Sequence, residues 1–165
     1  GNLNLYLGQL SAGAAVIACD VFDPRLWKRQ LEACRADGIY LIPAKLRALK
    51  QVYEREREPE KQTNRHVRLV LSGSQSFGGT EAQAVQRIFP EADLILLEGF
   101  KDSDYPKLEI IRRGNSSDCV CKEHNLRAVA TDLDRGEITG LPEEVPLFGL
   151  EDTEQIARFI VKELQ

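Results

Sequence analysis

The stretch that decides the fold is Asp93–Lys101, DLILLEGFK. Leu94–Leu97 is a short, unbroken apolar run, which is typical of a strand buried on both faces of a parallel sheet. Glu98 comes directly after this run. This is the position of a strand-end carboxylate that holds Mg²⁺ or orients an attacking water. Gly99 would let a ligand approach the backbone closely, and Lys101 would add positive charge near phosphates. The alternative is an ordinary strand that ends in a turn.

Outward from this stretch, short apolar runs alternate with amphipathic segments. This alternation predicts an α/β protein with a mainly parallel sheet and helices on both faces. We expect Leu94–Leu97 to be a central strand, with Glu98 beside a cleft at its carboxyl end. The other predicted strands are residues 14–21, 39–42, 67–71, 108–111, 128–130 and 146–148, and helices are predicted from 24, over 44–58 and 80–89, and after 152.

Two of the predicted helices begin with capping signals. Asp23 precedes Pro24, which places an N-cap carboxylate before a proline at the first helical position, and Gly38 is the predicted stop. Asp152 precedes the C-terminal helix, with Gln155 three residues on in a capping-box pattern. Both patterns favour helices whose starts are set locally.

Length and composition fit a single globular domain over residues 1–165. Hydrophobic residues make up 42% of the chain and charged residues 29%, and this balance excludes a disordered protein. The longest strongly apolar run is too short to cross a bilayer, and no signal-peptide pattern opens the chain, so a cytoplasmic location is expected. The net charge of −4 is spread without a basic patch, which argues against binding to nucleic acid or to a membrane.

The four cysteines, Cys19, Cys34, Cys119 and Cys121, do not have the spacing of a disulfide framework. Cys119 and Cys121 lie near His124, but a structural zinc site needs four ligands and no second pair of ligands follows. We therefore interpret them as loop cysteines.

Two glycine pairs have the spacing of a phosphate-binding loop without its lysine. Residues 8–15 read GQLSAGAA, in which Ala replaces both the Lys and the Ser/Thr of G-x-x-x-x-G-K-[ST]. Gly73 and Gly78 have the same spacing, and Thr80 is kept, but Gly79 stands in place of the lysine. Each segment is either a degenerate phosphate cradle or a turn that requires glycine conformations.

The sequence from 92 to 164 resembles the MobB family, which serves molybdenum-cofactor maturation. DLILLEGFK is followed by YPKLEI at 105–110, by LRAVATD at 126–132, and by VPLF at 145–148 before the terminal helix. Residues 67–77 resemble the family more loosely, and residues 1–66 match it only in general layout.

The resemblance implies a P-loop NTPase-like fold that binds GTP with Mg²⁺ and assists attachment of GMP to molybdopterin. It places Glu98 near the Mg²⁺, with Gly99 and Lys101 bordering the phosphates. It places Thr131 and Asp132 near the base or ribose, although an acid at a strand end is often only a turn or helix cap. The implied partners are the molybdenum-cofactor guanylyltransferase or molybdoenzyme maturation proteins, and a homodimer is a further implication.

Loss of the P-loop lysine would remove charge stabilisation from phosphoryl transfer. Our hypothesis is an accessory protein that binds guanine nucleotide or a maturation partner, and that is at most a weak GTPase. One alternative is an active GTPase whose P-loop is obscured by missing residues, since the sequence has no methionine. The other is a scaffold module that no longer binds nucleotide.

Overall fold

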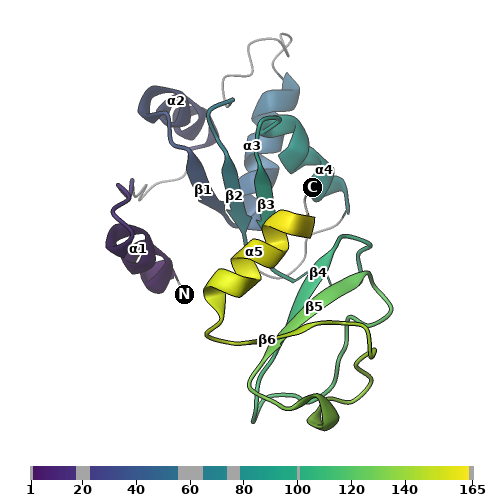
Figure 1. Ribbon diagram of the computed structural model, residues 1–165. Helices are drawn as coiled ribbons and strands as arrows, with labels where there is room; N and C mark the ends of the chain where they lie inside the picture. Colours follow the sequence, from purple (N-terminus) through teal and green to yellow (C-terminus); the bar gives the residue numbers. More distant parts are fainter. Residues whose placement is uncertain (1, 18–22, 56–64, 74–78, 100, 164–165) are drawn as a thin grey trace. The chain divides into compact units, whose positions relative to one another are not determined.

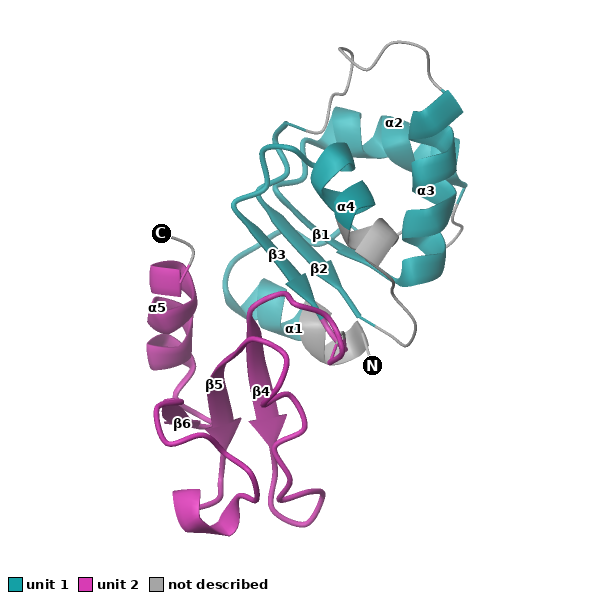
Figure 2. Ribbon diagram, turned by 90° about the vertical axis from the view of Figure 1, so that its right-hand side faces the viewer, with its two compact units in different colours: residues 1–75, 80–97 teal, residues 76–79, 98–165 magenta. Residues whose placement is uncertain are grey.

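The computed structural model describes residues 2–17, 23–55, 65–73, 79–99 and 101–163, without the side chains of 2–6 and 79–82. Within these ranges the chain divides into two compact units (Figures 1 and 2). The first contains residues 1–75 and 80–97, and the second contains residues 76–79 and 98–165. Each unit is built on its own three-stranded parallel sheet.

The first unit is a strand–helix alternation with strand order β1-β2-β3. Because the strands follow one another in sequence and in space, right-handed crossovers put both connecting helices on one face of the sheet. Figure 2 shows α3 and α4 on the same side. The elements are α1 (Asn2–Ser11), α2 (Pro24–Cys34), β1 (Gly38–Leu41), α3 (Pro43–Arg55), β2 (Leu69–Ser72), α4 (Gly79–Ile88) and β3 (Leu94–Leu97).

One face of this sheet carries the core. Ile39 pairs with Val70, and Leu41 pairs with Ser72, and all four side chains are buried. The helices contribute further fully buried side chains, Leu46 and Leu49 from α3 and Val85 from α4. The helix predicted over 44–58 therefore forms as α3 and packs its apolar side chains into this core.

The opposite face of the same sheet is apolar but only partly covered. Leu69 and Leu71 are half-buried, and Leu96 is 39% exposed. β3 pairs only with β2 in this sheet and forms its edge. The prediction that Leu94–Leu97 is the central strand, buried on both faces, is therefore wrong. An apolar run favours burial but does not give the number of neighbouring strands.

The N-terminal cap of α2 is confirmed. The Asp23 carboxylate accepts hydrogen bonds from the backbone N–H groups of Arg25 (2.8 Å) and Leu26 (3.1 Å). The helix ends earlier than predicted, because Arg35 adopts a left-handed conformation (φ 49°) and its N–H donates to the Leu31 carbonyl. Gly38 therefore begins β1 instead of ending the helix.

The second unit has strand order β4-β5-β6, again with every pair parallel. One face of its sheet covers a core of Ile111, Cys119, Val129, Ile138 and Val145. The elements are β4 (Lys107–Ile111), β5 (Leu126–Thr131), the 3₁₀ helix η2 (Arg135–Glu137), β6 (Leu147–Gly149) and α5 (Thr153–Glu163).

Helix α5 is attached to the other face of this second sheet. The rings of Phe148 on β6 and Phe159 on α5 lie 5.3 Å apart between centroids, in a tilted arrangement. The apolar side chains Ile156, Phe159 and Ile160 of α5 are half-buried. The Asp152 carboxylate accepts the Gly149 N–H (3.0 Å), so it fastens the β6–α5 turn.

The predicted α/β class is confirmed, with two parallel sheets in place of a single sheet. Residues 98–99 and 101–106, which the structure describes between β3 and β4, contain no helix. The predicted strand at 14–21 is not formed over 14–17, and 18–21 lies outside the described residues. The single domain over 1–165 stays a prediction.

No helix in the part of the chain that the structure describes is long and apolar enough to cross a membrane.

Candidate functional site

The predicted residues Gly73 and Glu98 each directly follow a strand of the first sheet in sequence. Ser72 at the end of β2 pairs with Leu97 at the end of β3. Gly73 and Glu98 are the residues that follow this pair, and Gly73 is buried whereas Glu98 is exposed. Gly99 has a φ of 99°, which strongly favours glycine, and its missing Cβ faces open space. A carboxylate and a bare backbone therefore leave the sheet at the end where parallel sheets bind ligands.

Lys101 and Lys107 occupy different environments. Lys101 lies exposed in a turn, whereas Lys107 on β4 is 9% exposed. The Lys107 ammonium donates to three backbone carbonyls, those of Ser103, Tyr105 (3.0 Å) and His124 (2.9 Å). These bonds use all three donors of the ammonium group, so Lys107 does not supply the cation that the glycine loops lack.

Residues 8–13 do not form a phosphate cradle. Gly8 lies inside α1, and its carbonyl accepts the Ala12 N–H (3.1 Å). Gly13 follows the end of the helix with a φ of 80°. A phosphate cradle needs free N–H groups at a helix N-terminus, but this segment is a C-terminus, where carbonyl groups repel anions. The spacing of the two glycines was the misleading signal.

The second glycine pair is described only at its ends. Gly73 follows β2, and Thr80 lies in the first turn of α4, so the segment joins a strand to a helix as a phosphate cradle would. Gly78 and the rest of 74–78 lie outside the described residues, as does the side chain of Thr80. The assignment of Gly73, Gly78 and Thr80 to phosphate stays a prediction.

Thr131 is the last residue of β5, and Asp132 follows it directly. The buried Thr131 hydroxyl accepts the Leu133 N–H (3.0 Å), and the exposed Asp132 carboxylate accepts the Arg113 N–H (2.6 Å). Asp132 therefore ties the end of β4 to the end of β5. Its contact with a base or ribose stays a prediction.

A buried carboxylate missed by sequence reasoning organises the two cysteines. Glu109 on β4 is 9% exposed, and accepts the backbone N–H groups of Val120 (2.9 Å) and Cys121 (3.1 Å) and the Cys119 thiol (3.2 Å). Burial, together with Glu109, raises the pKa of Cys119 to about 12. The strand pattern could have indicated that Glu109 is buried. Side chains two residues apart in a strand lie on the same face, so Glu109 shares a face with Lys107 and the apolar Ile111.

Glu98 fits Mg²⁺ only as one ligand among several. Among the described residues, no three His, Cys, Asp or Glu side chains are grouped to hold a metal ion. Mg²⁺ commonly binds one or two protein carboxylates together with water and the phosphates of a nucleotide. Glu98 could hold Mg²⁺ in that way, and the metal would neutralise phosphate charge.

Two parallel three-stranded sheets with helices define an α/β protein. Residues 62–132 match the family model of MobB, the molybdopterin guanine dinucleotide synthesis protein B. The resemblance to MobB is thereby confirmed, and over this segment the chain is of MobB type with an arrangement consistent with a P-loop NTPase-like fold. The match indicates involvement in molybdopterin guanine dinucleotide synthesis.

The matched segment contains β2, α4, β3, β4 and β5, and with them every predicted site residue. It starts upstream of the clearest resemblance at residue 92 and ends at Asp132, before β6 and α5. No curated protein and no solved structure matches the chain.

Proposed function

We propose that this protein binds guanine nucleotide with Mg²⁺ as an accessory factor in molybdopterin guanine dinucleotide synthesis. The observation that carries the proposal is the exposed Glu98 carboxylate directly after β3, within the MobB-type segment. Gly99 leaves room for phosphate beside it, and Lys101 adds a positive charge two residues further on. The triphosphate would lie beside Glu98 and Gly99, which directly follow β3 in sequence.

Hydrolysis in this arrangement would be slow. Lys107 is bound to three carbonyl groups, and residues 8–13 present a helix C-terminus, so neither replaces the P-loop lysine. Lys101 is two residues after Gly99, on an exposed turn without the fixed geometry of a cradle. The proposed role is therefore to hold nucleotide for a partner protein in the cytoplasm. That partner would be the guanylyltransferase or a molybdoenzyme maturation protein, and this chain would bind it as a homodimer.

Calorimetric titration of the full chain with GTP, GDP and ATP in the presence of Mg²⁺ tests this function. We expect GTP to bind more tightly than ATP, and Glu98→Gln to weaken GTP binding about tenfold through loss of the metal-linked carboxylate. Glu91→Gln is the matched control, because Glu91 is an exposed glutamate just before the same strand.

Phosphate release from the same samples should stay below about 10⁻³ s⁻¹, the scale of an unassisted GTPase. Fast release abolished by Glu98→Gln would show an active GTPase instead. Absence of binding by all three nucleotides would leave a scaffold module.

A further inference from the structure

The turn at 103–105, which follows Lys101 along the chain, is held by two side chains. Each of its three consecutive backbone carbonyl groups accepts a side-chain N–H. The Lys107 ammonium donates to the first and third carbonyls, the third at 3.0 Å, and the Asn125 amide donates to the second at 2.9 Å. Connecting segments on a protein surface are usually more mobile than the elements they join, whereas this one is bound at every residue.

The two donors lie together at the amino ends of β4 and β5. Lys107 is the first residue of β4, and Asn125 directly precedes β5. The backbone N–H of Lys107 donates to the Asn125 carbonyl (3.0 Å), and its ammonium also binds the His124 carbonyl (2.9 Å). Asn125 has a φ of 55°, in the left-handed region that asparagine enters more readily than most residues. The turn is therefore anchored on the second sheet.

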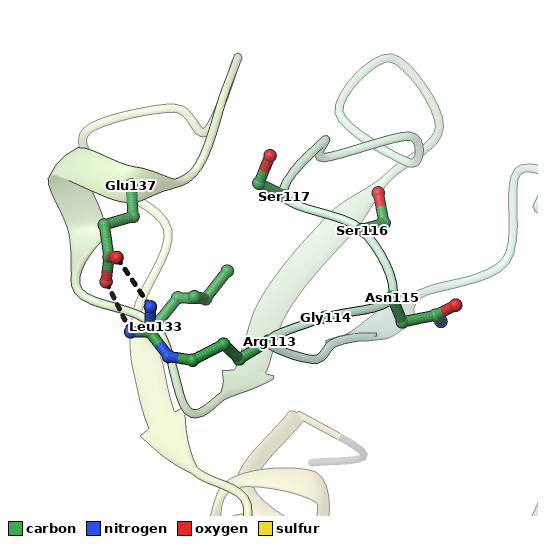
Figure 3. A pocket seen from close by; sticks show the side chains of 7 residues that line it. All are labelled: Arg113, Gly114, Asn115, Ser116, Ser117, Leu133 and Glu137. Carbon is green, nitrogen blue, oxygen red and sulfur yellow. Dashed lines mark hydrogen bonds and ion pairs between the residues drawn. The ribbon is translucent and has the colours of Figure 1, made fainter.

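The two strands are joined without these side-chain bonds. β4 and β5 pair in parallel along their length. The segments beyond their carboxyl ends meet through the ion pair of Arg113 and Glu137, at the wall of a cavity of about 470 Å³ (Figure 3). Lys107 and Asn125 act at the opposite end of the same strands, so their bonds to 103–105 order the turn more than the sheet.

The anchored turn ends the segment that carries the proposed phosphate site. This segment begins with Glu98 and Gly99 and continues through the exposed Lys101 to the turn, within the second unit. Ordering a mobile segment when a ligand binds costs conformational entropy, whereas a segment that is already ordered binds without that cost. Anchoring the turn therefore restricts the backbone that presents the Lys101 ammonium.

We propose that Lys107 and Asn125 are positioning residues, which preorganise the segment of Glu98, Gly99 and Lys101 for the phosphate groups of a nucleotide. Neither residue touches the ligand. This inference rests on the proposed function, because it requires Lys101 to face phosphate. It gives a single exposed lysine a defined place without the cradle of a P-loop.

A double-mutant cycle between Lys101 and Asn125 tests the proposal by calorimetric titration of the full chain with GTP and Mg²⁺. Asn125→Gly removes the amide that binds the turn and keeps a residue that adopts the left-handed conformation freely. We expect Asn125→Gly to weaken GTP binding about fivefold and Lys101→Ala to weaken it about tenfold. In a chain that already carries Lys101→Ala, Asn125→Gly should weaken binding by less than about twofold. A general loss of stability would lower the affinity equally with and without Lys101.

Lys107→Met tests the second donor. It leaves three carbonyl groups without their donor, so GTP binding should weaken at least about tenfold. Arg158→Met is the matched control, because it removes an exposed ion pair with Glu154 on α5, and it should leave the affinity unchanged. Thermal unfolding shows which variants are folded, and the cycle with Asn125→Gly decides the question if Lys107→Met is not.

The proposal is overturned if folded Asn125→Gly binds GTP like the parent, if it weakens binding by the same factor with and without Lys101, or if Lys101→Ala has no effect. GTP binding that depends on Glu98 would still support the proposed function in each of these cases. Absence of GTP binding by the parent chain would instead refute the proposed function and the positioning role together.

Discussion

Glu109 and Lys107 show how single buried charges hold the second unit together. They alternate with Ile111 along β4, so all three point into the same side of the sheet. Lys107 binds the carbonyl groups of the 103–105 turn and of His124, and Glu109 binds the 119–121 segment. Each charge replaces its lost hydration with several hydrogen bonds, which is the condition for burying it.

At this scale we predict that Glu109→Ala lowers the free energy of unfolding by about 3 kcal/mol, because it leaves two buried N–H groups and a thiol without an acceptor. Urea denaturation followed by circular dichroism measures the change. Glu143→Ala, at an exposed glutamate of the same unit, should change stability by less than about 0.5 kcal/mol. Equal effects of the two variants would contradict a structural role for Glu109.

Helix α2 illustrates what a local signal can fix at the scale of an element. Asp23 and Pro24 set the start of the helix, and the backbone N–H groups of Leu26 and Arg25 lower the pKa of Asp23 below its ordinary value of 3.8. The helix ends at Arg35, which has a left-handed conformation. Arginine is not one of the residue types, glycine and asparagine, that signal such an end in a sequence. Starts of this kind are therefore easier to predict than ends.

We predict that Asp23→Ala lowers the urea midpoint by about half a molar at pH 7, through loss of the cap. Since the folded pKa is lowered, the ionised carboxylate stabilises the fold above pH 3.8, and this contribution is lost as the pH falls through the folded pKa. The difference between Asp23→Ala and the parent should therefore shrink below pH 3.8. Asp23→Asn is the control, because it keeps a capping side chain that does not titrate. If the difference in stability between the parent and Asp23→Ala did not depend on pH, ionisation of Asp23 would not contribute to stability.

The start of α4 is the second element to test. Gly79, its first residue, stands where a P-loop would have lysine, and a strand-to-helix connection without that lysine is a weak signal for phosphate. We predict that Gly79→Lys leaves the affinity for GTP unchanged in calorimetric titration, with circular dichroism confirming the fold. A sharp increase in affinity would instead identify 73–80 as a latent phosphate cradle.

At the scale of the whole molecule, two parallel sheets share one chain. Each has three strands, and the second face of the β1-β2-β3 sheet is only half-covered, as the exposed Leu96 shows. Parallel sheets are generally stable when both faces are covered, and small units bury a lower fraction of their surface. We therefore propose that the two units are one folding domain over residues 1–165.

This proposal predicts a single cooperative unfolding transition. Trp27, the one tryptophan of the sequence, reports on the first unit by fluorescence, and labelling of the buried Cys119 and Cys121 reports on the second. In a Cys19→Ser, Cys34→Ser variant, the two probes should give the same urea midpoint within about 0.2 M. Two separate midpoints would show two independent domains.

Local patterns in the sequence predicted most of the elements and their class, although they missed α1 and predicted a strand at 14–21 that is not formed over 14–17. Apolar runs and helix periodicity predicted six strands and four helices close to where they form, because these patterns depend on neighbours in the chain. The capping of α2 and the strand-end position of Glu98 were local in the same way. The MobB resemblance likewise came from short motifs, and those at 93–101, 105–110 and 126–132 lie within the segment that the family model matches.

The edge strands of each sheet and the hydrogen bonds between distant polar groups depend on the tertiary structure. The apolarity of Leu94–Leu97 could not reveal that β3 has one neighbour, since pairing depends on a strand far away in sequence. Gly8 and Gly13 have the spacing of a phosphate-binding loop, but Gly8 lies within helix α1 and Gly13 follows its end. Arg113 and Glu137 meet beyond the carboxyl ends of β4 and β5, and Glu109 binds the 119–121 segment. These contacts could not be predicted, because hydrogen bonds between distant residues leave no periodic pattern in the sequence.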